Sequence, residues 1–142
     1  MTTLDLQDAH FHVPIHQKHR KYLRFQVAGQ HFQFKVLPFG LKSAPQIFTK
    51  CLAPVAAYLR QEGFQVFLYL DDWLVKAPSS REASRATRAC LTLFHRLGLT
   101  LNLRKSLLHP RTEIVFLGAE LHTIQDKAYP MSERHQRLKM LA

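Results

Sequence analysis

The stretch VFLYLDDWLV (residues 66–75) places two adjacent carboxylates, Asp71 and Asp72, inside an otherwise apolar run. Runs rich in β-branched and aromatic residues on both sides of the pair predict a β-hairpin with the carboxylates at or beside its tip. Neighbouring carboxylates repel each other, so in apolar surroundings one of them binds a proton or both bind a cation. Asp is also common in tight turns because its side chain bonds its own backbone. This stretch alone leaves cation binding and simple turn formation as alternatives.

The composition is that of a basic protein of about one domain. The 142 residues are 46% hydrophobic, enough for a packed core, and 20 Lys and Arg against 10 Asp and Glu give a net charge of +10. Such a surface attracts polyanions, of which nucleic acid is the commonest, although a generically basic surface has the same composition. Two cysteines predict no disulfide framework and favour an intracellular location, with cytoplasm and nucleus not distinguished. No apolar run approaches the roughly 18 residues that cross a bilayer, so no membrane partner is expected.

The rest of the sequence alternates segments typical of strands and of helices. Residues 2–8 alternate as a short strand with Asp5 near its end, and two strand-like runs around AGQ (28–30) predict another hairpin. The segments that follow are a helix at 46–63, the hairpin around Asp71, a helix at 79–98, a strand at 99–102, a hairpin at 113–122 and a helix from 132. This order predicts an α+β fold in which a mainly antiparallel sheet carries helices on one face.

The two longer helices have recognisable ends and apolar faces. Pro45 suits the first turn of the first helix, which Pro54 interrupts. Ser79 and Glu82 form a capping box at the start of the second helix, and Gly98 ends it. The positions expected to be buried are Ile47, Phe48, Cys51, Leu52, Val55, Ala56 and Leu59 in the first helix, and Ala86, Cys90, Leu93, Phe94 and Leu97 in the second.

A third carboxylate, Asp5, ends a strand that can lie beside the Asp71–Asp72 hairpin. Carboxylate oxygens suit Mg²⁺, which proteins usually bind through one or two carboxylates together with substrate phosphates. Two such ions about 3.5–4 Å apart can activate an attacking hydroxyl and stabilise a leaving group in in-line displacement. An acidic centre on a basic protein is therefore typical of a polymerase or a nuclease.

Five segments in order carry a more specific signal: LDLQDAHFHVPI (4–15), VLPFGLKSAPQIF (36–48), FLYLDDWLV (67–75), LTLNLRKS (99–106) and VFLGAEL (115–121). They resemble the successive palm motifs of reverse transcriptases, and the likeness runs from about residue 3 to residue 121. The sequence HVPIHQKHRKYLRF (12–25) is most similar to those of retrotransposons of the DIRS type and their pararetroviral relatives. The resemblance implies a polymerase palm that adds deoxynucleotides from dNTP to a primer 3′-hydroxyl on an RNA or DNA template.

The same resemblance implies roles for individual residues at the catalytic centre. Asp5 and Asp71 would bridge two Mg²⁺ ions, with Mn²⁺ as a possible substitute, and Asp72 would tune the site. Leu6 would lend a backbone carbonyl to one metal. Lys105 matches a lysine that protonates the leaving pyrophosphate, although an ordinary exposed lysine is an equal alternative.

A second group of residues matches positions that bind the incoming nucleotide. The backbone N–H groups of Asp8 and Ala9 would face the triphosphate, with a simple turn role as the alternative for Asp8. His10 departs from the family, which usually has Tyr or Phe there to block a ribose 2′-hydroxyl. Weaker exclusion of ribonucleotides and a decay mutation both remain open for it. Phe39 and Gly40 complete this group.

A third group of residues would contact the nucleic acid strands, among them a basic strip in HQKHRK (16–21). Its members are Tyr69, Pro45, Phe116, Leu117, Gly118, Lys18, Arg20 and Lys21.

The domain assignment expected from the resemblance is a reverse-transcriptase palm at 1–122 and the start of a connection toward the thumb at 123–142. Truncated fingers, a missing thumb and any RNase H segment would belong to the remainder of a parent polyprotein. The alternative function is an inactive remnant that at most binds Mg²⁺ and nucleic acid. A two-metal nuclease is a distant third, because it would not need the order of the five motifs.

Overall fold

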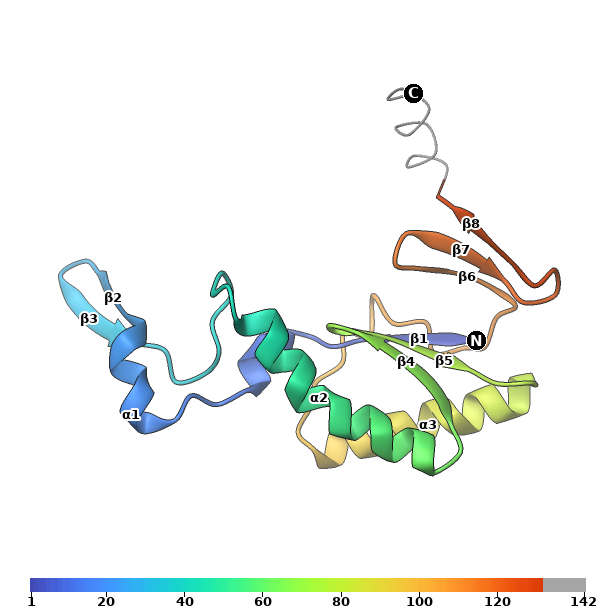
Figure 1. The fold of residues 1–142 in the computed structure, drawn as a ribbon, viewed down its shortest axis with the longest axis horizontal. Coiled ribbons are helices and arrows are strands. Elements are labelled where there is room, and N and C mark those ends of the chain that lie inside the picture. Colours follow the sequence, from blue (N-terminus) through green and yellow to red (C-terminus); the bar gives the residue numbers. More distant parts are fainter. Residues whose placement is uncertain (132–142) are drawn as a thin grey trace, which may run out of the picture.

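The computed structural model of the chain describes residues 1–131. Its central sheet consists of β1 (Thr2–Asp5), β5 (Asp72–Lys76) and β4 (Gln65–Tyr69), in the order β1-β5-β4, with both pairings antiparallel. Helices α2 (Ala44–Gln61) and α3 (Ser80–Arg96) lie on the same side of this sheet (Figure 1). The predicted α+β fold, with helices on one face of an antiparallel sheet, is confirmed.

Alternate residues of the central strands divide between two faces. Leu4 and its cross-strand partner Trp73 are buried in the core beneath the sheet, where the Trp73 ring packs edge-on against Phe94 of α3 with ring centroids 4.9 Å apart. Thr2 also points toward α3, because its hydroxyl lies 2.7 Å from that of Thr87. Since side chains alternate along a strand, Asp5 lies on the opposite, helix-free face.

A second, two-stranded sheet lies at one end of the molecule (Figure 1). It consists of β2 (Arg24–Val27) and β3 (Gln30–Gln33), joined by the two-residue turn predicted around Gly29. Three short helices lead to it from β1, namely η1 (Ala9–His12), α1 (Gln17–Arg20) and η2 (Lys21–Leu23).

A third sheet lies toward the other end and on the helix-free side of the central sheet (Figure 1). Its strands are β6 (Glu113–Phe116), β7 (Ala119–His122) and β8 (Lys127–Pro130), and the predicted hairpin around Gly118 is confirmed. Ile114 of β6 packs with Met1 and with Leu74, the β5 residue beside Trp73. The sequence reasoning missed β8, an exposed strand that contains a proline.

Three details of the predicted elements are wrong. No strand forms at 99–102, because only Leu101 makes an isolated bridge, to Leu6, before the chain turns at Asn102. Ile47 and Cys51 are exposed, since the buried stripe of α2 follows a spacing of four residues from Ala44 and leaves them on its flank. Leu97 is exposed because it is the residue at which α3 ends.

The predicted helix ends hold. The Ser79 hydroxyl accepts a hydrogen bond from the Glu82 N–H and donates one to the Glu82 carboxylate. Pro45 lies in the first turn of α2. None of the helices within residues 1–131 combines the length and the apolarity needed to cross a membrane. The helix predicted from residue 132 lies outside the described residues.

Candidate active site

The predicted carboxylates meet where β1 ends and β5 begins. Asp5 and Asp72 are direct partners in the antiparallel register, so their side chains lie on the same, helix-free face. Asp71 is in the two-residue turn between Tyr69 and Asp72, and its carbonyl accepts a hydrogen bond of 3.2 Å from the Leu6 N–H. Backbone hydrogen bonds therefore hold Asp5, Asp71 and Asp72 at one end of the central sheet.

The turn that carries Asp71 adopts a backbone conformation that is unusual for its sequence. Leu70, the first residue of the turn, has a positive φ of 54°. Two-residue hairpin turns of this kind favour glycine there, because a side chain at positive φ is strained. Strained backbone of this sort occurs preferentially at functional sites.

The electrostatics of these carboxylates combine burial with like charges, which Lys105 relieves only in part. Burial raises the pKa of Asp5, which Lys105 lowers in part and Asp71 raises further. Burial also raises the pKa of Asp72, and the charges of Asp71 and Asp5 add to the increase while Lys105 opposes it. The site thus favours a bound proton or another cation over free carboxylates.

The turn from Asn102 to Ser106 also holds Asp5 in place, although the sequence pointed only to Lys105 within it. The Asn102 N–H donates to the Asp5 carbonyl at 2.9 Å, and the Asp5 N–H donates to the Ser106 hydroxyl at 3.0 Å. That hydroxyl in turn donates to the Asn102 carbonyl at 2.8 Å. Asn102 and Ser106 are therefore positioning residues, and their turn brings Lys105 toward the carboxylates. Short polar side chains that bond nearby backbone were the signal available in the sequence.

The donor set suits a hard divalent cation, with one restriction. Within residues 1–131, no three His, Cys, Asp or Glu side chains lie close enough together to hold a metal ion on their own. Mg²⁺ needs only one or two carboxylates when water and phosphate oxygens complete its shell. The repelling Asp5–Asp72 pair fits that mode, and its metal role stays a prediction.

The residues predicted to bind the incoming nucleotide gather around η1. Asp8 caps this short helix with positive φ (49°) and no side-chain hydrogen bond, and Ala9 is buried. The His10 ring lies against Phe39 and Phe48, with ring centroids 5.0 and 5.3 Å away. Its Nδ1 is buried without a hydrogen-bond partner among residues 1–131, which is unusual for a polar atom.

Two further observations concern the surroundings of η1. Gly40 has φ of +84°, and no atom lies within 4 Å of the position that a Cβ would occupy, so the backbone there is open to close approach. His12 connects η1 to the segment after α3. Its Nδ1 bonds the Ala9 carbonyl and its Nε2 accepts a hydrogen bond from the Thr100 N–H, both at 3.0 Å.

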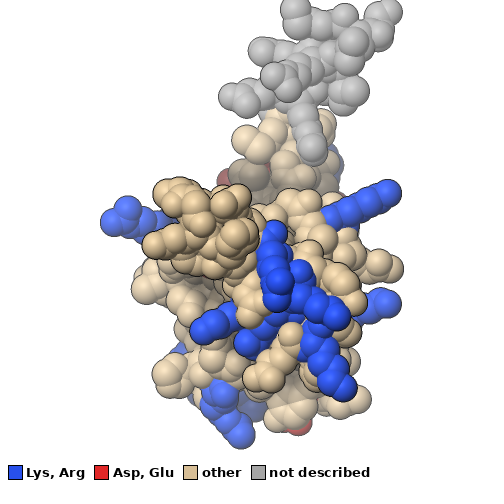
Figure 2. All heavy atoms as spheres, turned by 90° about the vertical axis from the view of Figure 1, so that its left-hand side faces the viewer, with Lys and Arg blue, Asp and Glu red and all other residues tan. Residues whose placement is uncertain are grey.

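Among the remaining predicted residues, Tyr69 of β4 is the direct cross-strand partner of Asp72, whereas Phe116, Leu117 and Gly118 lie on another sheet. Phe116 ends β6, and Leu117 and Gly118 form the β6–β7 turn, where both have positive φ. Lys18 and Arg20 lie on α1 and Lys21 on η2, at the end of the molecule where Figure 2 shows Lys and Arg side chains gathered.

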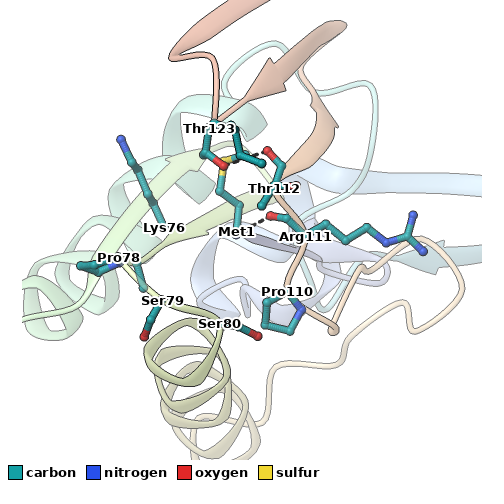
Figure 3. A pocket seen from close by; sticks show the side chains of 11 residues that line it. Met1, Lys76, Pro78, Ser79, Ser80, Pro110, Arg111, Thr112 and Thr123 are labelled. Carbon is teal, nitrogen blue, oxygen red and sulfur yellow. Dashed lines mark hydrogen bonds between the residues drawn. The ribbon is translucent and has the colours of Figure 1, made fainter.

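A pocket of about 400 Å³ lies at the opposite end of the β1–β5 ladder from the carboxylates (Figure 3). The Met1 amine donates a hydrogen bond of 2.7 Å to the Arg111 carbonyl at this pocket. The side chains of Lys76 and Arg111 extend to opposite sides of it and do not converge on its centre. The pocket contains none of the predicted catalytic residues.

Comparisons with known proteins agree with this fold. The family model described as "Reverse transcriptase (RNA-dependent DNA polymerase)" matches residues 1–121. Because the match covers most of the chain, the chain belongs to the reverse transcriptase family.

The similar proteins are viral and much longer. The genome polyprotein of Petunia vein clearing virus (isolate Shepherd) is 29% identical over 82% of this chain and 5% of its own length. Protein P of Duck hepatitis B virus (strain China) is 30% identical over 84% of this chain and 15% of its own length. This chain thus spans only a small part of these relatives.

Solved structures of similar fold come from foamy virus. The foamy viral protease-reverse transcriptase dRH in complex with double-stranded DNA matches 97% of this chain and 23% of its own, with a TM-score of 0.85 at 20% identity. The foamy viral protease-reverse transcriptase in complex with an RNA/DNA hybrid matches 97% of this chain and 18% of its own, with a TM-score of 0.81 at 24% identity. At this level of identity the two structures establish the palm fold alone.

Proposed function

We propose that this chain is the palm core of a retrotransposon reverse transcriptase, an RNA-directed DNA polymerase. Its reaction transfers a nucleotide from a dNTP to the 3′-hydroxyl of a primer paired to an RNA or DNA template. The observation that carries the proposal is the direct cross-strand pairing of Asp5 with Asp72, beside Asp71 and Lys105. A sheet gains nothing in stability from two like charges in this relationship, whereas phosphoryl transfer needs a site for cations.

Each chain segment has a separate task in this reaction. The primer 3′-hydroxyl gives its proton to water, and its oxygen attacks the α-phosphorus of the dNTP. The bond from the α-phosphorus to the oxygen that bridges the α- and β-phosphates breaks, and pyrophosphate leaves with that oxygen. Lys105 would donate a proton to the pyrophosphate, and the action of its charge on Asp5 and Asp72 supports this role. The turn at Asn102 and Ser106 keeps Asp5 in register through backbone contacts on its N–H and carbonyl.

Asp5, Asp71 and Asp72 would hold the divalent ions, with the Leu6 carbonyl as a further ligand. When bound, two Mg²⁺ ions supply charge stabilisation at the attacking and leaving oxygens. The backbone N–H groups of Asp8 and Ala9 would bind the triphosphate.

The other nucleotide and nucleic-acid contacts surround this centre. His10, Phe39 and Gly40 would enclose the sugar and base of the dNTP. Tyr69, Pro45 and the Phe116–Leu117–Gly118 turn would contact the template and the primer. We place this activity inside the cell, within a parent polyprotein that supplies further fingers, a thumb and any RNase H segment.

The test is primer extension on poly(rA)/oligo(dT) with Mg²⁺. It compares this chain, its Asp71→Asn variant, and a longer chain in which fingers and thumb are supplied, with and without Asp71→Asn. Positioning contributes about 10⁵-fold or more to such reactions, so we expect extension from the longer wild-type chain and little from the chain alone. Extension that survives Asp71→Asn in the longer chain would refute the proposal.

A second candidate is an inactive remnant that binds Mg²⁺ and nucleic acid without polymerising. The observation that favours it is His10, which replaces the Tyr or Phe usual in the family and whose buried Nδ1 has no hydrogen-bond partner among residues 1–131. A longer chain that binds template-primer but gives no extension, and gains extension with His10→Tyr, would support this candidate.

A further inference from the structure

The β2–β3 hairpin has an exposed aromatic face. Phe25 and Phe32 are direct cross-strand partners whose rings stack with centroids 5.6 Å apart at an interplanar angle of 23°. Phe34 lies against Phe25, with ring centroids 4.9 Å apart. Phe25 and Phe32 are 40% and 44% exposed. Three aromatic rings thus form one contiguous surface that is open to solvent.

Nothing within residues 1–131 covers this face. The two strands form a separate sheet, and all eight of their residues are exposed. Figure 1 shows the hairpin projecting beyond the end of the central sheet at which β1 ends and β5 begins. An isolated two-stranded hairpin is marginally stable in water, so an exposed aromatic face on one indicates a binding surface.

The charges around the hairpin identify the partner. Residues 9–43 contain no Asp or Glu, and their six cations are Lys18, Arg20, Lys21, Arg24, Lys35 and Lys42. Beside the hairpin, the Lys21 ammonium lies 5.1 Å from the centre of the Tyr22 ring, and Tyr22 is 75% exposed. Figure 2 shows Lys and Arg side chains gathered on this end. A stretch without acids suits a polyanion, and exposed rings beside cations suit one whose bases are accessible.

We infer that the β2–β3 hairpin is a stacking platform for unpaired bases of a single-stranded nucleic acid. Bases stack on the rings of Phe25, Phe32 and Phe34, while Lys21 binds the phosphates. A duplex hides its base faces in its own stack, so the platform selects single strands. The inference rests on the proposed function in one respect, because the proposed function identifies the bound single strand as the part of the template that has not yet been copied.

The test measures binding by fluorescence anisotropy, with a labelled oligo(dT) of about 20 nucleotides and a blunt duplex of equal length at the same salt concentration. In the Phe25→Ala/Phe32→Ala double variant we expect single-strand affinity to fall about 5- to 100-fold and duplex affinity to change less than about twofold. Phe32→Trp should retain single-strand binding, and its indole fluorescence should be quenched by the oligonucleotide. Tyr58→Ala, which removes an exposed ring from α2, is the matched control and should bind as the wild type does.

Leucine variants separate stacking from other uses of the face. Phe25→Leu/Phe32→Leu keeps an apolar surface but loses the rings, so it should bind single strands as weakly as the alanine variant. Wild-type affinity in the leucine variant would overturn the inference and indicate an apolar docking site for protein. An equal loss of single-strand and duplex binding in either variant would also overturn it. If the alanine variant does not fold, by circular dichroism, the leucine and tryptophan variants decide the question.

Primer extension separates this inference from the proposed function. The Asp71→Asn variant should retain Phe-dependent single-strand binding although it extends no primer. Extension by the longer chain together with single-strand binding that is insensitive to Phe25 and Phe32 would refute the platform alone. Phe-dependent binding without extension by the longer chain would refute the proposed function alone.

Discussion

Asp5 lies directly opposite Asp72 in the antiparallel pairing of β1 with β5. Like charges in this position destabilise a sheet, and burial together with neighbouring carboxylates raises the pKa of Asp72. Lys105 opposes this rise without cancelling it. The end of the central sheet therefore carries a stability cost that only a bound cation or proton relieves.

Neutralising one member of the pair should stabilise the metal-free protein and impair its reaction. We expect Asp72→Asn to raise the Tm at pH 7 by roughly 2–5 °C, because it removes repulsion with Asp5 and Asp71. Primer extension by the longer chain should fall about 10-fold or more, since charge placed at the reacting phosphate is lost. Thermal melts and extension assays check both effects. Asp126→Asn, on the exposed β7–β8 turn, is the control, and a lower Tm for Asp72→Asn than for this control would contradict the expectation.

The burial of Asp5 and Asp72, together with their repulsion, predicts how stability depends on pH. The pKa values of Asp5 and Asp72 are raised above the ordinary value of 3.8, so the folded state binds protons more tightly than the unfolded state. Their contribution to stability is therefore greatest below pH 3.8 and is lost as pH rises through the folded-state pKa values. Because other groups also titrate, the measurement is the Tm difference between wild type and Asp5→Asn/Asp72→Asn in EDTA from pH 3.5 to pH 8. The double variant should gain relative to wild type as pH rises, and a constant difference would exclude the effect.

Loss of the Ser106 hydroxyl should loosen Asp5 without removing any charge. Ser106→Ala deletes the acceptor of the Asp5 N–H and the donor to the Asn102 carbonyl. We expect a loss of about 1–2 kcal/mol in the free energy of unfolding, measured in urea. Extension by the longer chain should fall with the apparent affinity for Mg²⁺, whereas Ser84→Ala on α3 should alter neither. Wild-type Mg²⁺ dependence in Ser106→Ala would show that the turn has no positioning role.

The contrast between Asp71 and Ser106 shows how far the sequence could predict this site. Paired carboxylates in an apolar run identified the hairpin, and alternation identified β1, because both signals are local. The Asp5–Ser106 hydrogen bond joins residues 101 positions apart, and no local pattern records it. The strand predicted at 99–102 failed for the same reason, since apolar spacing cannot show that the chain turns at Asn102. β8 escaped prediction because its pairing with β7, and not its own proline-containing sequence, makes it a strand.

His12 should contribute to stability by connecting η1 to the segment after α3. His12→Phe keeps an aromatic ring but loses the bonds to the Ala9 carbonyl and the Thr100 N–H. Leaving these backbone groups without partners should cost about 1–3 kcal/mol, measured as the change in the free energy of unfolding. His12→Gln can still accept from the Thr100 N–H and should recover part of the loss. Equal stability of the Phe and Gln variants would mean that the Thr100 bond contributes nothing.

His10 should set the discrimination between deoxyribonucleotides and ribonucleotides. Its ring packs against Phe39 and Phe48, so a larger side chain there must extend toward the predicted nucleotide site. In the longer chain, we expect His10→Tyr to raise the ratio of kcat/KM for dNTP over rNTP by roughly 10-fold, because the phenol ring would collide with a 2′-hydroxyl. His10→Phe is the matched control and should show the same gain if ring size is the cause. A gain in His10→Tyr alone would implicate the hydroxyl, and equal selectivity in all three proteins would remove His10 from the nucleotide site.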